Sequence, residues 1–415
     1  MPALRSRRHG SGEDAGLSTM KLLVISHTPH YLKEGRLVGW GPTVRELDHL
    51  PEIFKRVIHL APLHHEVTPE AALPYQSTRL EFRPLPPAGG GRLRDKLTIL
   101  IRAPQYLRAI IKAMREVDAV HVRCPANISL LAILLLACVP RPRLRWVKYA
   151  GNWRPTTREA WSYAFQRWWL NKNLHRGVVT VNGRWPEQPK HVHSFLNPCL
   201  TEQELIEAGT VAAEKELSAP LRLLYAGRLE TAKGVGRAIE VLHQLRQRGI
   251  AARFDIVGDG AERSAFEGLV SGRELHQVVT FHGWLARTPL NQLFARAHFL
   301  IFPAASSEGW PKVLSEGMAH GVVPVAGSVS SIPQYLNSFQ TGRTCAPDDV
   351  MAFVDVLVWY AQHPERWKEE SANGVQAAQL FSYSNYLQAV RTIFALSDAP
   401  PPKGYLDNGF VAEPH

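Results

Sequence analysis

Short apolar runs recur along the chain and alternate with longer stretches in which apolar residues repeat at helical spacing. The first run, Lys21 to His27, has a continuous apolar centre without the polar alternation of a half-exposed strand, so it is typical of a buried parallel strand. Further strands are predicted over 119–123, 144–149, 177–181, 221–226, 254–257, 278–282, 297–302 and 322–326. Helices are predicted from Thr43 and over 89–115, 128–139, 153–173, 235–248, 311–320 and 381–396. This alternation predicts an α/β fold with parallel sheets.

The stretch 305–326 predicts a loop, a short helix and a strand. Pro311 suits the first helical turn, and Gly321 suits the left-handed residue that ends a helix. Glu308 then lies in the loop before the helix, and Glu316 lies inside it. A helix N-terminus binds phosphate through its free N–H groups and its dipole. The alternative is that Glu308 only caps the dipole while Glu316 is a solvated helix residue.

Two further strand ends carry residues that suit a phosphate ligand. The run 221–226 leads into Gly227 and Arg228, with Lys233 five residues later, just before the next predicted helix. Two cations at the end of a parallel strand can form a clamp for a pyrophosphate. The first strand is followed by a predicted loop with Gly39 and Gly41, as in a nucleotide-binding unit. The alternatives are a pair of surface cations and glycines that only form turns.

The segment Ser306 to Val325 is similar, almost position by position, to the Glu-x7-Glu donor motif of retaining glycosyltransferases of family 4, which have the GT-B fold. The segment Gly227 to Gly234 resembles the Gly-Arg-x-x-x-x-Lys-Gly motif of the same family. The resemblance covers most of 20–396 and is strongest over 221–335. It implies an α/β protein of two Rossmann-like domains facing across a cleft, with a nucleotide sugar in the second and an acceptor in the first.

The resemblance also implies roles for single residues. Arg228 and Lys233 would stabilise the leaving diphosphate, Glu308 would hold hydroxyls of the transferred hexose, and Glu316 would bind the ribose. The expected catalytic residues are Glu308, Arg228 and Lys233. The expected donor contacts are Gly39, Gly41, Gly227, Arg228, Lys233, Val257, Gly258, His282, Gly283, Trp284, Glu308, Gly309, Trp310, Pro311, Lys312, Val313, Leu314 and Glu316.

The donor would be a UDP- or GDP-linked sugar. No cofactor is required, and no metal is expected, because the chain has no Asp-x-Asp motif.

The first half of the chain departs from the family pattern. His121-Val-Arg123-Cys-Pro125 stands where many members have His-x-His-x-Pro, and Asn152 lies where a second acceptor-side histidine is usual. A guanidinium cannot act as a base, but it can bind a phosphate or carboxylate of the acceptor. We therefore take His121, Arg123 and Asn152 as the acceptor-side candidates. Ser330 and Ser331 replace a common Gly-Gly pair, which would alter the loop over the donor.

The predicted organisation has five parts. Residues 1–19 are expected to be a disordered tail, because they are polar and rich in glycine and arginine. The acceptor-side domain is expected over 20–198, since His193 to Pro198 resembles the strand end that closes the first domain of the family. The nucleotide-sugar domain is expected over 199–380, a helix that crosses back to the first domain over 381–398, and a proline-rich tail over 399–415.

Charge is divided unevenly along the 415 residues. The net charge is +11, but residues 1–200 carry 30 Lys and Arg against 14 Asp and Glu, whereas the remainder is net acidic. A basic half needs an acidic partner, such as a phosphorylated acceptor or an anionic membrane. Nucleic acid is not expected, because no nucleic-acid-binding motif accompanies the charge. The helix 89–115 combines cations with apolar residues and could lie on a membrane surface; the alternative is a core helix with a solvated basic face.

Four scattered cysteines and the lack of a signal peptide predict a cytoplasmic protein, with peripheral contact at the inner face of the membrane. The predicted function is transfer of a hexose-type sugar, with retention, from a nucleoside diphosphate sugar to a hydroxyl of a lipid-linked or polysaccharide acceptor. One alternative is a catalytically silent nucleotide-sugar-binding subunit or sensor. Another is a phosphorylase of the same fold that uses inorganic phosphate.

Overall fold

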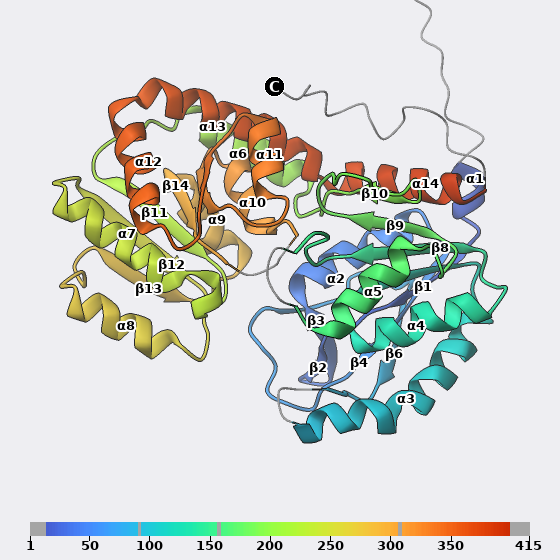
Figure 1. Ribbon diagram of the computed structural model, residues 1–415. Coiled ribbons are helices and arrows are strands. Elements are labelled where there is room, and N and C mark those ends of the chain that lie inside the picture. Colours follow the sequence, from blue (N-terminus) through green and yellow to red (C-terminus); the bar gives the residue numbers. More distant parts are fainter. Residues whose placement is uncertain (1–13, 90–92, 156–158, 306–308, 399–415) are drawn as a thin grey trace, which may run out of the picture. The chain divides into compact units, whose positions relative to one another are not determined.

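The computed structural model describes residues 14–89, 93–155, 159–305 and 309–398. The chain divides into two compact units. The first contains the described residues within 1–149, 160–180 and 387–401, and the second contains residues 150–159 and 181–386. In Figure 1 the first unit is coloured mainly blue to green and the second mainly yellow to orange.

The larger sheet has seven strands in the order β10-β9-β8-β7-β1-β4-β6. Its inner strand β1 pairs in parallel with β4 and β7, and four of its five residues are fully buried, as the apolar run predicts. The strands are β1 (Lys21–Ile25), β4 (Arg56–Pro62), β6 (Leu80–Leu85), β7 (Ala119–Cys124), β8 (Leu144–Tyr149), β9 (Val178–Val181) and β10 (Val192–Ser194). Because β1, β7 and β8 are parallel, their C-terminal ends lie at one edge of the sheet.

A small antiparallel sheet stands where a loop with Gly39 and Gly41 was expected. It comprises β2 (His30–Lys33), β3 (Arg36–Trp40) and β5 (Ala72–Pro74). Glu34 and Gly35 form the two-residue turn, both with positive φ (52° and 76°), which matches the twist of a hairpin. Gly39 therefore lies in a strand, and Gly41 is the first residue of a helix.

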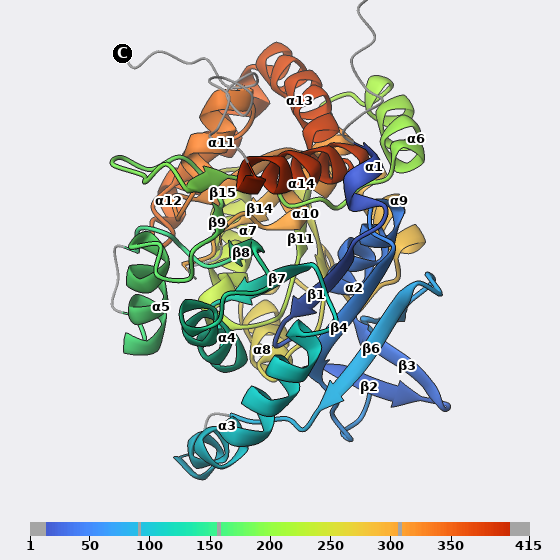
Figure 2. The same ribbon diagram turned by 90° about the vertical axis from the view of Figure 1, so that its right-hand side faces the viewer.

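Helices of the first unit pack on its sheet. They are α2 (Gly41–Asp48), α3 (Leu93–Met114), α4 (Asn127–Cys138) and α5 (Trp161–Asn171), with a short 3-10 turn at Leu50–Glu52. Figure 2 shows α3, α4 and α5 in a row on one side of the strands. The helix predicted over 153–173 is shorter than expected and begins at Trp161. Pro155 disfavours a helical conformation at Arg154, which excludes the first residues of the predicted range from the helix.

The second unit has a six-stranded sheet in the doubly wound order β13-β12-β11-β14-β15-β16. Its strands are β11 (Leu221–Ala226), β12 (Ala252–Val257), β13 (Val279–Gly283), β14 (Phe299–Phe302), β15 (Val323–Gly327) and β16 (Arg343–Cys345). Its helices are α6 (Glu202–Ala213), α7 (Val235–Gln247), α8 (Arg263–Gly272), α9 (Arg287–Arg296), α10 (Lys312–Ala319), α11 (Ile332–Phe339), α12 (Val350–Gln362) and α13 (Pro364–Ala378), with 3-10 turns at Thr231–Lys233 and Gln379–Phe381.

The chain ends are helical where the structure describes them. A four-residue helix, α1 (Asp14–Leu17), lies in the segment expected to be a disordered tail, while residues 1–13 and 399–415 lie outside the described residues. The last helix, α14 (Tyr383–Asp398), belongs to the second unit up to Tyr386 and to the first unit from Leu387. Its Phe394 is buried against Phe54 and Trp146 of the first unit.

Candidate functional site

The turn after β11 brings together the first group of predicted residues. Gly227 donates its N–H to the carbonyl of Val257 (3.0 Å) at the end of the neighbouring strand. The exposed Arg228 pairs with Glu230, and Lys233 closes the 3-10 turn before α7. Burial lowers the pKa of Lys233 to about 8, with Glu230 opposing the shift and Arg228 adding to it. This lysine is therefore mostly charged at pH 7 and partly desolvated, so an anion beside it would interact with it strongly.

Three glycines bring the ends of β11, β12 and β13 into contact. Gly258 has a φ of 126°, and a Cβ there would lie 1.9 Å from the carbonyl oxygen of Gly227. Its N–H donates to the carbonyl of Gly283 (2.7 Å), which also has a positive φ. Only glycine fits at position 258, so two backbone turns can approach each other closely. The structure thus brings the predicted Gly227, Val257, Gly258 and Gly283 together at one sheet edge.

His282 and Trp284 flank Gly283 but are not free side chains. The His282 Nε2 atom lies 2.6 Å from Oδ1 of Asp255 on β12, and Trp284 is half-buried. The His282 ring is thus directed to the sheet face that carries Asp255. Its predicted contact with the donor base stays a prediction.

The predicted helix 311–320 corresponds to α10. Pro311 is its N-cap, and Gly321 follows its end with a φ of 69°, so both expected boundary residues have their expected roles to within one position. Leu314 is fully buried and Pro311 is buried, whereas Lys312 and Val313 are half-buried. Glu308 lies outside the described residues.

Glu316 is held by an arginine that the sequence did not single out. Nη1 of Arg287, at the start of α9, lies 2.5 Å from Oε1 of Glu316, and Nε of Arg287 lies 3.1 Å from Oε1 of Glu204. Burial opposes the charge on Arg287, but the carboxylates of Glu316 and Glu204 outweigh it, so the pKa of Arg287 is raised. The guanidinium therefore fixes the orientation of the Glu316 carboxylate.

Polar contacts anchor the chain just before α10. The Ser331 hydroxyl donates to the carbonyl of Gly309 (2.7 Å), and the N–H of Gly309 donates to the carbonyl of Ala150 (3.3 Å). A Cβ on Gly309 would lie 2.3 Å from Nδ2 of Asn182, so the chain passes close to that side chain. Ser331 therefore does what a glycine at this position could not do, which is to fix the loop through its hydroxyl.

Trp310 has a structural role in this loop. It is 3% exposed, its ring stacks on Phe381, and its Nε1 donates to the hydroxyl of Ser315 (2.7 Å). Its backbone can still face a ligand, but its side chain belongs to the core.

Gly39 and Gly41, predicted to approach the diphosphate, lie in the first unit. A Cβ on Gly39 would lie 2.6 Å from the His30 ring, and a Cβ on Gly41 would lie 2.5 Å from the carbonyl oxygen of Ala71. Packing within the first unit is therefore sufficient to explain both glycines. Their donor contact remains a prediction.

A buried charge cluster lies at the ends of β7 and β8. The fully buried Glu46 on α2 accepts from Nη1 of Arg123 and from Nζ of Lys148, each at 2.7 Å through the same carboxylate oxygen. Arg123 and Lys148 are 14% and 4% exposed. The formal charges of the three groups sum to +1, and Arg123 stands where the family pattern has a histidine.

The other two acceptor-side candidates, His121 and Asn152, lie in different units. His121 is fully buried and stacks on Trp146 with ring centroids 3.6 Å apart. Burial, with the charges of Arg123 and Lys148, lowers the pKa of His121 well below its usual value, so the ring is neutral at pH 7. Asn152 is buried in the second unit, where its Oδ1 accepts from the N–H of Arg154 (3.0 Å).

The described part of the chain contains no group of three or more His, Cys, Asp or Glu residues arranged to hold a metal ion. Among the same residues, no helix combines the length and the apolar character needed to cross a bilayer.

Residues 212–376 match the family model described as glycosyl transferases group 1, and this range lies within the second unit. Over 168 residues the chain is 33% identical to the glycogen synthase of Mycobacterium tuberculosis. The aligned region covers 38% of this chain and 40% of that protein. Over 151 residues it is 27% identical to the amylovoran biosynthesis glycosyltransferase of Erwinia amylovora. This second aligned region covers 35% of this chain and 37% of that protein. The chain thus spans about two fifths of the length of the curated relatives it matches.

Similar solved structures cover nearly the whole chain. Sucrose-phosphate synthase from Thermosynechococcus elongatus gives a TM-score of 0.66 at 19% identity, over 91% of this chain and 99% of that one. The Anabaena protein HepE in complex with UDP gives a TM-score of 0.63 at 13% identity, over 92% of this chain and 100% of that one. The expected fold class is confirmed: the chain has the GT-B fold, with two Rossmann-like domains.

Proposed function

We propose that this protein is a retaining glycosyltransferase that moves a hexose from a nucleoside diphosphate sugar to a hydroxyl of a polysaccharide or lipid-linked acceptor. The observation that carries the proposal is the meeting of the Arg228 to Lys233 turn with the turns at Gly258 and Gly283 at one edge of the second sheet. Similarity to proteins named for amylovoran biosynthesis and glycogen synthesis supports the reaction class. The likeness to a protein solved with UDP supports a nucleotide-sugar donor.

The chemistry would consist largely of stabilising the leaving group. The bond between the sugar anomeric carbon and the diphosphate oxygen breaks, and the acceptor oxygen bonds to the same face of that carbon. The acceptor hydroxyl proton passes to the departing diphosphate. Arg228 and Lys233 would neutralise the charge that develops on the diphosphate, each such contact typically contributing about 3 to 4 kcal/mol in the transition state.

Donor recognition would depend on Glu316. A carboxylate can accept hydrogen bonds from two neighbouring ribose hydroxyls, and the ion pair with Arg287 holds that of Glu316 in a fixed position. Glu308 would hold hydroxyls of the transferred sugar near the anomeric carbon. Neither role requires a metal ion.

Acceptor recognition would use the first unit. The net positive cluster of Glu46, Arg123 and Lys148 favours an acceptor with a phosphate or carboxylate group. Because His121 is fully buried, it would support this cluster as a neutral ring.

We also propose peripheral contact with the inner face of an anionic membrane. Leu100 and Ile101 on α3 are 72% and 74% exposed, and α5 exposes Trp161, Tyr163 and Trp168. Exposed apolar and aromatic side chains beside cations are typical of interfacial binding. Figure 2 shows these two helices in the same layer of the first unit.

Vesicle flotation tests the membrane proposal. The protein is expected to float with vesicles of phosphatidylglycerol and phosphatidylcholine at low salt and to be released at high salt, because the Debye length shortens. The variant Leu100→Ser with Ile101→Ser should bind at least tenfold more weakly. Ile206→Ser changes an apolar side chain on α6 that is 65% exposed, and it should bind like the wild type. Equal binding of all three proteins, or no binding at low salt, would remove the membrane from the proposal.

Calorimetric titration with UDP and GDP tests the donor site. One of the two is expected to bind, and Glu316→Ala should bind it about 10- to 100-fold more weakly because charge-assisted hydrogen bonds to the ribose are lost. Glu365→Ala, which removes an exposed carboxylate at the start of α13, is the matched control and should bind like the wild type. Unchanged affinity in Glu316→Ala would refute this role for Glu316. Binding without any turnover would favour a silent subunit or sensor.

A further inference from the structure

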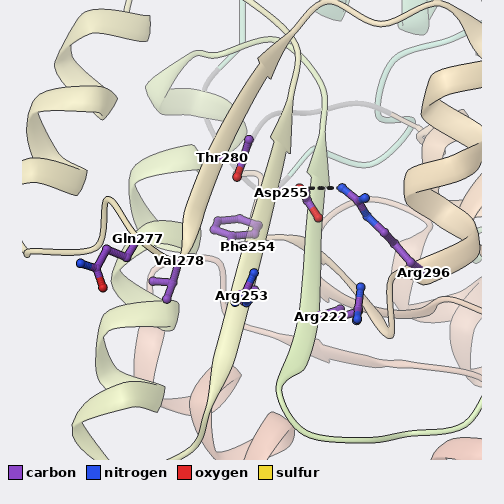
Figure 3. A pocket seen from close by; sticks show the side chains of 8 residues that line it. All are labelled: Arg222, Arg253, Phe254, Asp255, Gln277, Val278, Thr280 and Arg296. Carbon is purple, nitrogen blue, oxygen red and sulfur yellow. Dashed lines mark hydrogen bonds and ion pairs between the residues drawn. The ribbon is translucent and has the colours of Figure 1, made fainter.

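A cavity of about 170 Å³ lies on one face of the second sheet, close to the start of its strands. It is lined by Arg222, Arg253, Phe254, Asp255, Gln277, Val278, Thr280 and Arg296, which Figure 3 shows as sticks. Arg222 and Arg253 are the second residues of β11 and β12, whereas the glycine turns proposed to bind the donor follow the last residues of these strands. The cavity is therefore at the opposite end of the strands and is not part of the donor site.

The register of the strands places the polar residues of the cavity on a common face. Arg222 pairs with Arg253, and Asp255 pairs with Thr280, in adjacent parallel strands. Arg222, Arg253 and Thr280 are exposed, and Asp255 is half-buried. Parallel sheets are usually covered by helices on both faces. This part of the face instead exposes charged side chains around a hollow.

The charges around the cavity do not balance. It holds three guanidinium groups and one carboxylate, and that carboxylate is already shared: Oδ1 of Asp255 lies 3.2 Å from Nη2 of Arg296 and 2.6 Å from Nε2 of His282 (Figure 3 marks the contact with Arg296). Within the described residues, neither Arg222 nor Arg253 has a carboxylate partner. Like charges gathered at one cavity repel each other, and an anion would relieve that repulsion.

We propose that this cavity binds the dianion of a phosphate monoester, separately from the donor site. Arginine is suited to phosphate, because its planar fork donates two parallel hydrogen bonds to two oxygens. The charges of Arg222 and Arg253 match the charge of a dianion, and the Thr280 hydroxyl supplies a neutral donor. The cavity has the volume of roughly six waters of the bulk liquid, which leaves room for a phosphate group and part of its carrier.

The same residues link the cavity to the donor side of the sheet. A bound dianion competes with Asp255 for Arg296, and Asp255 is bonded to His282. The next residue along the chain, Gly283, accepts the N–H of Gly258 in the turn that we assign to the donor. We therefore expect phosphate in the cavity to change the affinity for the nucleotide. This coupling rests on the proposed function, but binding in the cavity does not.

Calorimetric titration with inorganic phosphate and with glycerol 3-phosphate tests the site. It is done in an Arg228→Ala and Lys233→Ala background, so that phosphate cannot bind the donor clamp. We expect saturable binding that weakens at least tenfold in Arg253→Gln and is lost when Arg222→Gln is added. Arg246→Gln removes an exposed arginine of α7 and should bind as tightly as the background protein. No saturable binding, or equal affinity in Arg253→Gln and Arg246→Gln, would overturn the proposal.

Two further comparisons define the source of the phosphate and its effect. Weaker flotation of the Arg222→Gln and Arg253→Gln protein with phosphatidic acid vesicles would identify a lipid phosphate, and unchanged flotation would identify a soluble ester. Phosphate also competes with the nucleotide at the donor clamp of the wild type, and Asp255→Asn leaves that competition in place. The coupling is therefore the part of the phosphate-dependent shift in nucleotide affinity that Asp255→Asn removes, and we expect it to be at least threefold. An equal shift in the wild type and Asp255→Asn would overturn the coupling, whereas a wild type that binds no nucleotide at all would count against the proposed function instead.

Discussion

Replacement of Lys233 by alanine is expected to lower kcat by about 100- to 1000-fold, with a much smaller loss of donor affinity. Lys233 follows the turn at Gly227 and is partly desolvated, so its charge acts strongly on a diphosphate that gains negative charge as it leaves. The interaction strengthens in the transition state, and its removal therefore reduces turnover more than binding. Release of nucleoside diphosphate gives kcat, and calorimetry gives the affinity. A variant with unchanged kcat would exclude Lys233 from the reaction.

The pH dependence of kcat/KM also tests whether Lys233 acts through its charge. Burial lowers the pKa of Lys233 to about 8, so the free protein loses this positive charge as the pH rises through 8. We expect kcat/KM to fall above that pH in the wild type. Lys233→Arg should keep a flat profile to about pH 10, because a guanidinium stays protonated. Identical profiles of the two proteins would contradict the assignment.

Replacement of Lys215 by methionine is expected to destabilise the second unit by about 3 kcal/mol or more. The buried Nζ of Lys215 donates to three carbonyl oxygens, those of Phe294 (2.8 Å), Ala297 (2.9 Å) and His320 (2.6 Å). These carbonyls lie at the ends of α9 and α10, and each buried acceptor left without a donor costs about 1 to 3 kcal/mol. Because α9 carries Arg287 and α10 carries Glu316, the change also loosens the support of Glu316, which we propose binds the ribose.

Amide hydrogen exchange measures this effect without assuming that the two units unfold together. Exchange at the ends of α9 and α10 should accelerate by about 100-fold or more in Lys215→Met. Lys190→Met, an exposed lysine of the second unit, is the matched control and should exchange like the wild type. Equal protection in both variants would show that the three hydrogen bonds contribute little.

Much of the second unit could be predicted from its sequence. The strands at 221–226 and 254–257 and the helix after Pro311 follow from apolar runs and from boundary residues with fixed conformations. Gly258 and Gly321 do have positive φ values, as their positions at a strand end and a helix end indicate. These features are local, so a short stretch of sequence is sufficient to determine them.

Contacts between distant segments could not be predicted in the same way. Arg287 and Glu316 are 29 positions apart, and Arg123 and Glu46 are 77 positions apart, so no local pattern joins them. The hairpin at Gly39 was missed because the glycines suggested a loop, although Glu34-Gly35 is a usable signal for a two-residue turn. Ser331 was noted as a departure from the family, but its bond to Gly309 depends on how the two loops meet.

If Lys233 and its neighbours drive sugar transfer with retention, the anomer of the released sugar shows it most directly. Time-resolved proton NMR can follow slow hydrolysis of the nucleoside diphosphate sugar that the protein binds, with water as the acceptor. From an α-linked donor, we predict that the α sugar appears first and that Lys233→Ala suppresses its release. Initial release of the β sugar, or equal rates in the wild type and Lys233→Ala, would contradict the account.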